Sequence, residues 1–450
     1  MYRSFHPSNV FFVKFLSFVW CIMLFIIPRS NAQLRASVVK IDITPSDSQY
    51  LLGYNERKST GVMDRIYHRI IALEDGTTQF FIVSSDICLY SPAEYDKVAG
   101  KLQKQYGINP LNIWWAVTHT HSAPEFGGTG IYGTYMGDRI QHTVDTAYTA
   151  LLEQKLIDGI AEARKNLEPA KLSVGWGYSQ ANINRRAIDP NGRASLGMNP
   201  DAPVDRRIGL LRIDKTDGNP IALLANYPIH GTVMSGANLQ ISGDAPGVVS
   251  NYVEKKIGAP VLFINGAAGN IAPIYSVYPN ASAGHLSEFC VLLGDKILEA
   301  NRKISPVDSV HLFAGSLTVE TPRKPGLGWP TELNTYNKTT STGVNLVRLP
   351  VRFLKINNDI AVWSAPIELF CEVSNEVRER SPFAYTFYFG YTNGWFGYMP
   401  TAAEWPHGGY EVETVCPFTP SAARDLSEAV IGYLQGEMKN PQLPVKAKRK

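Results

Sequence analysis

Apolar positions change their period repeatedly along the chain, and this pattern predicts an alternation of strands and helices. Residues 37–43 alternate weakly between polar and apolar side chains, as a half-buried strand does. Residues 70–73 and 80–84 flank a turn and predict a hairpin. A helical stretch then runs from Ser91 to about residue 106, and the apolar run 112–117 is typical of a buried strand.

The same change of period continues to the end of the chain. We expect helices at 145–166, 246–256, 287–301, 368–380 and 421–438, and strands at 171–178, 208–213, 221–227, 260–265, 311–317, 351–363 and 386–389. Stretches that are polar or rich in glycine and proline are predicted as loops at 182–205, 323–343 and 391–420. Because no repeat or linker interrupts this pattern, we expect one α/β domain from residue 33 to residue 437.

The first 32 residues have the pattern of a signal peptide. Arg3 and Lys14 precede an uncharged run from Phe15 to Ile27, and small residues stand just before Gln33. The run is shorter than the roughly 20 residues of a membrane span, and no second run of that kind follows. We therefore expect a secreted or periplasmic protein with no transmembrane segment in the mature chain.

Composition and charge exclude several classes of protein. The 450 residues are 44% hydrophobic and 18% charged, which excludes a disordered, collagen-like or coiled-coil chain. The formal charge of +3 falls to zero without residues 1–32, which carry three basic and no acidic side chains, so we expect no nucleic-acid partner. The basic tail 438–450 is expected to be solvated.

The cysteines of the mature chain are Cys88, Cys290, Cys371 and Cys416, which are too sparse for a cysteine-rich metal site. They could form one or two disulfides or stay as four free thiols.

Two histidines separated by one residue are the strongest local sign of chemistry. His119 and His121 follow directly on the apolar run that ends at Val117. In a strand both would face the same side. Two imidazoles that leave a buried strand suit a metal site, or one ligand and a general base. The alternative is a pair of hydrogen-bonded structural histidines.

Further candidates stand alone in the sequence. His230 follows the strand-like residues 222–227, where it is either part of a site or a hydrogen-bonded loop histidine. Glu368 is expected at the start of a helix, where the ordinary role of a carboxylate is to oppose the helix dipole. Residues 265–270 contain glycines but no Walker lysine or dinucleotide fingerprint, so we expect a tight turn beside a site rather than a phosphate loop.

Taken together, these segments resemble the neutral/alkaline non-lysosomal ceramidase family of secreted zinc amidases. The most specific match is Thr118-His119-Thr120-His121-Ser122-Ala123-Pro124, which is similar to the family's Thr-His-Thr-His-Ser-Gly-Pro signature. The other matching segments follow in the family's order: Ile41 to Pro45, Gly53-Tyr54, Asn184-Arg185, Pro228-Ile229-His230, Ser242-Gly243-Asp244, Ala365 to Glu368, and Tyr391 to Tyr398 with Thr401, Glu404 and Tyr410.

The resemblance implies a fold, a cofactor and a set of site residues. It implies a central pair of β-sheets covered by helices, with the site on loops at strand ends. It implies Zn²⁺ as the cofactor and hydrolysis of an amide or ester bond in a small-molecule or lipid-like substrate. The implied zinc ligands are His119, His230, Glu368 and Tyr398. The implied catalytic residues are His121 for proton transfer, and Arg185 and Tyr410 for the oxyanion.

The sequence also departs from the family pattern. Where the family has Gly-Asp-Val-Ser-Pro with a catalytic serine, this chain has Gly269-Asn270-Ile271-Ala272-Pro273, so we expect a divergent member that lacks this serine. The chain ends about one helix after the tyrosine segment, so we expect no C-terminal immunoglobulin-like domain.

These departures leave two functional hypotheses and one variant. The first is a zinc-dependent hydrolase in which zinc-activated water attacks, because Ala272 cannot. The second is a catalytically inactive, metal-containing binding protein on the same scaffold. In a weaker variant, Ser122 or Ser242 replaces the missing hydroxyl. The aromatic residues of the last loop form either an apolar wall of the site or part of the core: Trp395, Phe396 and Trp405.

Overall fold

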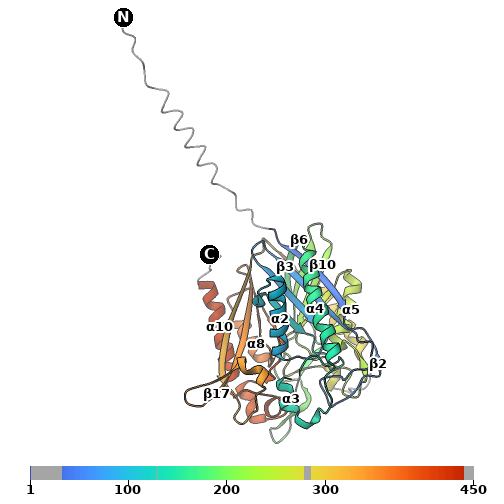
Figure 1. Cartoon of the computed structure of the whole chain (residues 1–450), viewed down its shortest axis with the longest axis vertical. Helices are drawn as coiled ribbons and strands as arrows, with labels where there is room; N and C mark the ends of the chain where they lie inside the picture. The colour runs from blue at the N-terminus through green and yellow to red at the C-terminus, as the bar shows by residue number, and fades with distance from the viewer. Residues whose placement is uncertain (2–32, 129, 278–284, 440–450) are drawn as a thin grey trace.

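Two β-sheets lie face to face in the computed structural model, and helices cover their outer faces (Figure 1). Besides Met1, the structure describes residues 33–128, 130–277 and 285–439. The expected signal peptide and nearly all of the basic tail therefore lie outside the described residues. In the part of the chain that is described, no helix has the length and apolar character that a membrane span requires.

The larger sheet has nine strands in the described residues. Its order is β12 (Val261–Asn265), β10 (Pro220–Tyr227), β9 (Arg207–Lys215), β6 (Glu168–Tyr178), β1 (Arg35–Asp42), β3 (Tyr67–Glu74), β4 (Gln79–Ser85) and β5 (Ile113–Val117), with β14 (Ser305–Val307) added to β6. The β4–β5 and β10–β12 pairs are parallel and the other pairs are antiparallel. The predicted hairpin is β3–β4.

The second sheet is smaller and its strands come from the last third of the chain. Its order is β15 (Leu312–Pro322), β17 (Asn345–Ile356), β18 (Ile360–Ser364) and β20 (Tyr385–Phe389), with β16 (Asn337–Thr339) beside β17. Short pairings complete the strands: β7 (Asn182–Ile188) with β8 (Ala194–Asn199) and β13 (Ile271–Pro273), β2 (Gly61–Val62) with β11 (Gln240–Ile241), and β19 (Glu368–Leu369) with β21 (Tyr398–Met399).

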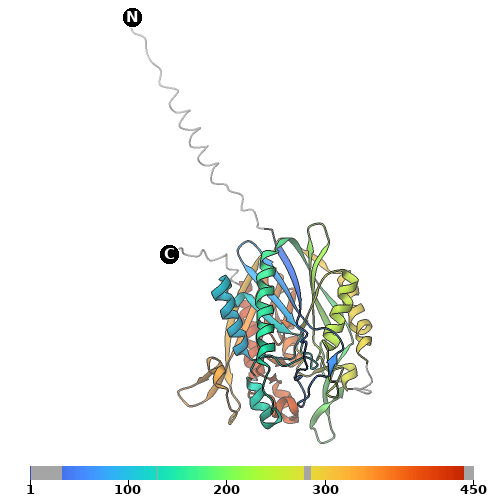
Figure 2. The ribbon, with the colours of Figure 1, turned by 45° about the vertical axis from the view of Figure 1, so that its right-hand side comes forward.

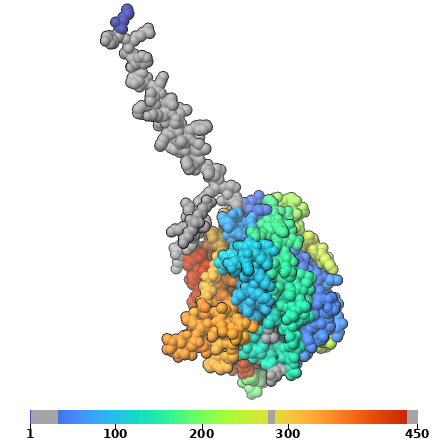
Figure 3. Space-filling model, viewed as in Figure 1, coloured from blue at the N-terminus to red at the C-terminus, as the bar shows by residue number. Residues whose placement is uncertain are grey.

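Helices form the two outer layers. They are α2 (Pro92–Tyr106), α3 (Ile131–Met136), α4 (Thr146–Lys165), α5 (Asp244–Ile257), α6 (Ile274–Val277), α7 (Asp295–Asn301), α8 (Cys371–Arg380), α9 (Tyr410–Glu413) and α10 (Ala422–Lys439). Figures 1 and 2 show α2 and α4 side by side over the large sheet, and α8 and α10 lie with the second sheet. In the space-filling view, segments from both ends of the described chain meet on one face (Figure 3).

Alternation along the strands builds the core between these layers. In β3, Ile71 and Leu73 join the cluster between the two sheets, whereas Ile70 and Ala72 face the helices. The second sheet does the same, because Val362 of β18 faces the large sheet and its neighbours face α8 and α10. A pleated strand places successive side chains on opposite faces. The central strands carry apolar residues at both odd and even positions, so both faces of each sheet are covered and four layers result.

The large sheet is bent so that strands far apart in its order come together. The edge strand β12 contacts β3, β4 and β5 at the other end of the sheet. Ser84 Oγ of β4 donates a hydrogen bond of 2.5 Å to the backbone oxygen of Phe263 in β12. As a result, the chain that leaves β5 and the chain that leaves β10 emerge next to each other, and this juxtaposition positions the site described below.

The structure corrects all three predicted loops, and residues 391–420 contain β21, a 3-10 helix (Ala402–His407) and α9. Residues 182–205 contain the hairpin β7–β8, and residues 323–343 contain β16 and a short 3-10 helix, Thr331–Tyr336. The β7 sequence has no apolar alternation because two of its buried positions are arginines, Arg185 and Arg186. The cysteines of the described chain are all free thiols, so no disulfide forms in this part of the molecule.

A buried ion-pair network connects the large sheet to α5. Arg69 of β3 donates to Asp86 Oδ2 at 2.8 Å and to Glu254 Oε1 at 2.7 Å, and its side chain is 1% exposed. Removing one partner of a buried pair leaves an uncompensated charge in the core.

We predict that Arg69→Met lowers the free energy of unfolding by about 3–5 kcal/mol. The matched control is Arg35→Met, because Arg35 pairs with Glu74 but is 46% exposed, and there the loss should stay below about 1 kcal/mol. Urea denaturation of both variants and the wild type measures the difference. Equal losses in the two variants would contradict the structural role of the buried network.

Candidate metal centre

Three buried side chains from distant parts of the sequence converge on one point. His119 follows β5, His230 follows β10, and Glu368 is the first residue of β19; none is more than 2% exposed. Glu368 Oε2 lies 3.4 Å from His119 Nε2 and 3.1 Å from His230 Nε2. Tyr398 joins them, because its hydroxyl is 3.4 Å from His230 Nε2. The structure therefore brings together all four side chains implied as ligands.

The other ring nitrogen of each histidine fixes its tautomer. His119 Nδ1 lies 2.8 Å from the backbone oxygen of Cys88, and His230 Nδ1 lies 2.8 Å from that of Ile271. A carbonyl oxygen only accepts, so each Nδ1 must carry the proton and donate it. Each Nε2 is then left with a lone pair directed at Glu368, which is the arrangement found around metal-binding histidines.

The spacing of the donor atoms fits a small divalent cation. Zinc bonds to nitrogen and oxygen of about 2.0–2.2 Å place the ligand atoms of a tetrahedral site roughly 3.3–3.6 Å apart. The separations of 3.1 Å and 3.4 Å around Glu368 Oε2 are close to this range. The donors are also of the right kind, because imidazole, carboxylate and phenolic oxygen suit Zn²⁺.

The electrostatics of the group require one positive charge at its centre. Burial opposes ionisation of Glu368, but the positive charge of His119 holds the pKa of this carboxyl well below its usual value. Burial, followed by the charge of Arg185, lowers the pKa of His230 to about 3. Burial would also lower the pKa of His119, but Glu368 and Cys88 raise it to about 10. A proton or a cation between His119 and Glu368 supplies this charge.

Backbone contacts hold the two histidine segments in place. His119 has a φ of 61°, a left-handed conformation that is uncommon outside glycine and that marks local strain. The next residue, Thr120, bridges to Gly231, and the nitrogen of His121 donates to the oxygen of Gly231 at 2.8 Å. A Cβ atom on Gly231 would lie 2.6 Å from the Cα of Thr120, so only glycine allows this approach.

Asn265 connects the same two segments from the end of β12. Its Nδ2 donates to the oxygen of Ile229 at 2.7 Å and to the oxygen of Thr118 at 3.3 Å, and its Oδ1 accepts from the nitrogen of Ile229 at 3.0 Å. The following residues form a turn in which the nitrogen of Ile271 donates to the oxygen of Ala268 at 3.0 Å, and a Cβ on Gly269 would lie 2.6 Å from the oxygen of Glu368. The predicted turn at residues 265–270 is present, but it leads from β12 into the short strand β13 rather than into a helix.

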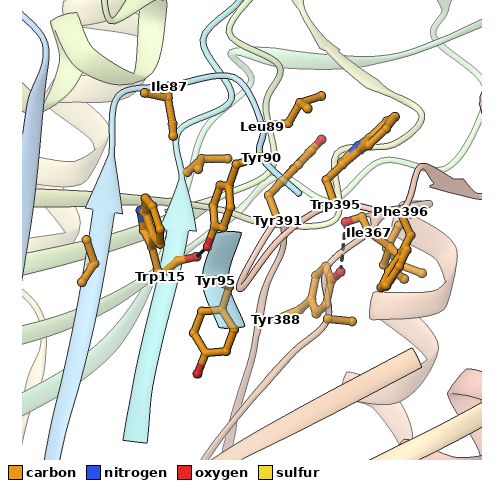
Figure 4. Close-up of a cluster of buried hydrophobic side chains, with 14 of the residues drawn as sticks. Ile87, Leu89, Tyr90, Tyr95, Trp115, Ile367, Tyr388, Tyr391, Trp395 and Phe396 are labelled. Atoms are coloured by element: carbon orange, nitrogen blue, oxygen red, sulfur yellow. Dashed lines mark hydrogen bonds between the residues drawn. The ribbon is translucent and has the colours of Figure 1, made fainter. Parts of the chain in front are cut away.

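Tyr391 and Trp395, which belong to a cluster of buried hydrophobic side chains (Figure 4), orient Glu368. The indole nitrogen of Trp395 donates to Glu368 Oε1 at 2.8 Å, and the hydroxyl of Tyr391 donates to Glu368 Oε2 at 3.1 Å. The ring of Tyr391 also stacks on His119 with centroids 4.3 Å apart. These contacts fix both carboxylate oxygens. The sequence left open whether Trp395, Phe396 and Trp405 form a wall of the site or part of the core. Trp395 and Phe396 are buried core residues, and Trp405 does not line the cavity described below.

Glu368 does not stand at the start of a helix, as its sequence position predicted. It pairs with Tyr398 in the parallel strands β19 and β21, and α8 begins at Cys371. The helix pattern of the following residues extended the prediction too far toward the N-terminus. The strand pairing places Glu368 and Tyr398 in register with each other, so both side chains are held at the site.

A cavity of about 620 Å³ lies beside this group, and Tyr398 is the member of the four that lines it. His121, Arg185, Tyr398 and Tyr410 all line it. His121 Nε2 lies 3.1 Å from His119 Nε2, and the ring of Tyr410 is 5.8 Å from that of Tyr398. The structure thus brings the three implied catalytic residues to the same cavity as the donor group.

Arg185 is held between the donor group and a second carboxylate. Its Nη2 donates to the hydroxyl of Tyr398 at 3.0 Å, and its Nε donates to Glu411 Oε1 at 2.9 Å. Arg186 donates to the other oxygen of Glu411 at 2.7 Å and to Glu404. Sequence reasoning missed Arg186 and Glu411. Two adjacent arginines in a polar stretch were the available signal, but their burial was not visible in the sequence.

The structure places the alternative hydroxyls away from the cavity. Ser122 accepts a hydrogen bond from Asn238, and Ser242 donates to Asp64; both serines are buried and neither lines the cavity. Ala272 does line it. At residue 272 the chain therefore presents only a methyl group to the cavity.

Comparisons with known proteins identify the family. The model of the neutral/alkaline non-lysosomal ceramidase family, N-terminal domain, matches residues 36–285, which is more than half of the chain. The match and the four-layer fold define a ceramidase-like hydrolase family. The chain belongs to the neutral/alkaline non-lysosomal ceramidase family.

Individual relatives are distant. The chain is 28% identical over 269 residues to neutral ceramidase B of Dictyostelium discoideum and 28% identical over 264 residues to neutral ceramidase of Pseudomonas aeruginosa. These matches cover 57% and 55% of this chain but only 36% and 38% of the relatives.

Solved structures confirm the predicted fold. The crystal structure of the Pseudomonas aeruginosa neutral ceramidase superposes with a TM-score of 0.72 over 94% of this chain and 76% of that chain, at 20% identity. A structure described as a ceramidase complexed with C2 gives a TM-score of 0.73 over 93% of this chain and 77% of that chain. The predicted α/β class, with paired sheets between helices, is confirmed.

We predict that Gly231→Ala weakens metal binding. The added methyl group would push the Thr120 backbone and shift His119 relative to His230, and such overpacking costs about 1–3 kcal/mol of stability. The control is Gly432→Ala in α10, where an added Cβ meets nothing within 4 Å. Zinc titration by calorimetry should show at least a tenfold weaker Kd in the first variant only. An unchanged Kd in Gly231→Ala would contradict this account of the site.

His142 connects two walls of the cavity through hydrogen bonds. The walls include residues 53–55 and the segment from Tyr132 to Arg139. His142, just beyond the second segment, contacts Glu56 through Nδ1 at 2.7 Å and Glu125 through Nε2 at 2.7 Å. Burial would lower its pKa, but the hydrogen bonds to both glutamates raise it above the usual value.

This raised pKa predicts a stability that depends on pH. The contribution of His142 is fully present below the unfolded-state pKa of about 6.5 and is lost as the pH rises through the folded-state pKa. Urea unfolding of the wild type and His142→Asn should therefore differ most at low pH, near pH 5.5, and least at pH 9. A difference that stays constant with pH would show that the imidazolium charge plays no part.

Proposed function

We propose that this chain is a zinc-dependent hydrolase that cleaves an amide or ester bond of an acylated substrate, with water as the attacking group. The observation that supports this best is the convergence of His119, His230, Glu368 and Tyr398 beside a cavity that Tyr398 lines. Zinc bound there would supply a Lewis acid that polarises a carbonyl and lowers the pKa of water toward about 7.

The residues of the cavity supply the remaining functions. His121 lines the cavity next to His119, where its imidazole can hold and pass on the proton that water loses. The guanidinium of Arg185 is fixed by Glu411 and Tyr398, so it is preorganised to stabilise negative charge on the carbonyl oxygen. Tyr410 adds a hydroxyl donor on the same cavity.

The position of Ala272 supports attack by water rather than by a side chain. Its methyl group lines the cavity at the position of the family's serine, and Ser122 and Ser242 are engaged elsewhere. The same observation favours a second candidate function, a metal-containing binding protein without activity. In both cases we propose that the mature chain acts outside the cytoplasm, since residues 1–32 have the pattern of a signal peptide.

The first test measures zinc and turnover on the same samples. Elemental mass spectrometry should find about one zinc per chain in the wild type and in His121→Ala, and a loss of zinc in His119→Ala and Glu368→Ala. A panel of fluorogenic N-acyl amides and esters should be hydrolysed by the wild type. His121→Ala should reduce kcat by about 10²–10⁴-fold, the usual contribution of a general acid or base.

The other outcomes separate the two functions. Absence of zinc from the wild type would remove the basis of the proposal. One zinc per chain without turnover would support the binding protein, and more strongly so if Ala272→Ser then gained activity. Turnover that His121→Ala leaves unchanged would assign the proton transfer to another group.

A further inference from the structure

The charged groups of the cavity have one sign. Among the described residues that line it, Arg139 and Arg185 carry charge and none is acidic. The aliphatic side chains on its wall are Met136, Leu196 and Ala272, whereas hydroxyl groups of tyrosine, serine and threonine make up much of the rest. Such a lining favours a polar, negatively charged compound over two long alkyl chains.

The two arginines differ in how their charge is balanced. Arg185 is 6% exposed and bound to Glu411 at the buried end. Arg139 is exposed, in the turn Gly137–Arg139 that follows α3, and no ion pair or hydrogen bond joins it to another described residue. Its charge is thus free to act at the solvent end of the cavity, away from the donor group.

A third arginine adds to the positive field from behind the wall. Arg57 is 9% exposed, and its Cζ lies 4.8 Å from the ring centre of Tyr54, which lines the cavity. Its Nη2 donates to backbone oxygens of Leu52 and His121. Its Nε and Nη1 are buried and have no hydrogen-bond partner among the described residues. No carboxylate of the described chain pairs with this guanidinium.

The nearby carboxylates do not cancel these charges. Glu56 and Glu125 are both bound by His142 at 2.7 Å. Glu411 is shared between Arg185 and Arg186, and Arg186 has Glu404 as a further partner. The positive charge that the donor group requires balances the carboxylate of Glu368, which also acts on Arg185. The unbalanced positive charge at the cavity is therefore that of Arg57 and Arg139.

We propose that the substrate is an N-acyl compound whose amine part carries an anionic group such as a sulfonate, carboxylate or phosphate. This inference rests on the proposed function, because it names the substrate class of that site. The acyl carbonyl sits at the buried end beside Arg185, and the anionic group sits at the solvent end beside Arg139. Hydrolysis breaks the amide C–N bond, water supplies the new C–O bond, and the amine leaves with a proton from that water.

A matched pair of substrates tests the charge preference. N-hexanoyl taurine and N-hexanoyl ethanolamine share the amide and the two-carbon spacer and differ in a sulfonate or a hydroxyl. With zinc-loaded wild type, kcat/KM should favour the sulfonate by about tenfold or more, and the preference should fall as salt rises. Arg139→Gln should reduce it about fivefold.

The control is Arg302→Gln, which removes an exposed arginine at the end of α7 that does not line the cavity. It should keep the wild-type preference. Equal or faster turnover of the ethanolamine compound would overturn the inference, as would equal losses of preference in the two variants. Either result would leave the hydrolase proposal in place.

Failure of the proposed function is a different outcome. If the zinc-loaded protein hydrolyses neither compound nor any of the fluorogenic amides and esters, the hydrolase proposal fails. Calorimetric binding of the same two compounds then tests the charge preference alone. The sulfonate should bind about tenfold more tightly, with the difference reduced in Arg139→Gln, and equal Kd values would overturn it.

Discussion

The site depends on one electrostatic constraint: lone pairs from two imidazoles and a carboxylate face each other in a dry interior. His119, His230 and Glu368 are almost completely buried, and their donor atoms lie 3.1–3.4 Å apart. Such a group is stable only if a positive charge lies among the donors. Hydrogen bonds from each Nδ1 to a backbone oxygen turn the lone pairs inward. The surrounding structure serves to hold this geometry.

The scaffold meets this constraint by bending the large sheet until the ends of β5 and β10 lie together. Asn265 and Gly231 then connect the two histidine segments through backbone hydrogen bonds and a close approach that excludes a side chain. The separate two-stranded pair β19–β21 contributes Glu368 and Tyr398. The cost of the left-handed backbone at His119 is offset by these contacts, as is common at functional sites.

Much of the fold follows from the sequence, because most strands and helices carry clear apolar periods. The hairpin β3–β4, the helices α2 and α4 and the strand β5 lie within a few residues of their predicted positions. The hairpin β7–β8 does not, because buried ion pairs replace the apolar alternation of β7. Periodicity records burial of apolar groups only, so a strand buried through salt bridges escapes it.

The sequence indicated only part of the site. His119 and His121 stood out because a His-x-His pair follows a buried strand. Tyr398 and Arg185 were selected through the family resemblance, since neither has a local signal of its own, and Glu368 was a weak candidate that only the resemblance made a ligand. The charge of Arg57 and Arg139 on the cavity could not be predicted, because it depends on contacts between segments far apart in the sequence.

The most direct test of the central claim is zinc K-edge X-ray absorption of the purified, metal-loaded protein. The account predicts a first shell of nitrogen and oxygen only, at about 2.0–2.2 Å, with the outer-shell scattering of two imidazoles. Cys88 lies close enough to His119 and His121 to form a competing donor group. A sulfur contribution near 2.3 Å would assign the metal to that group and contradict the account.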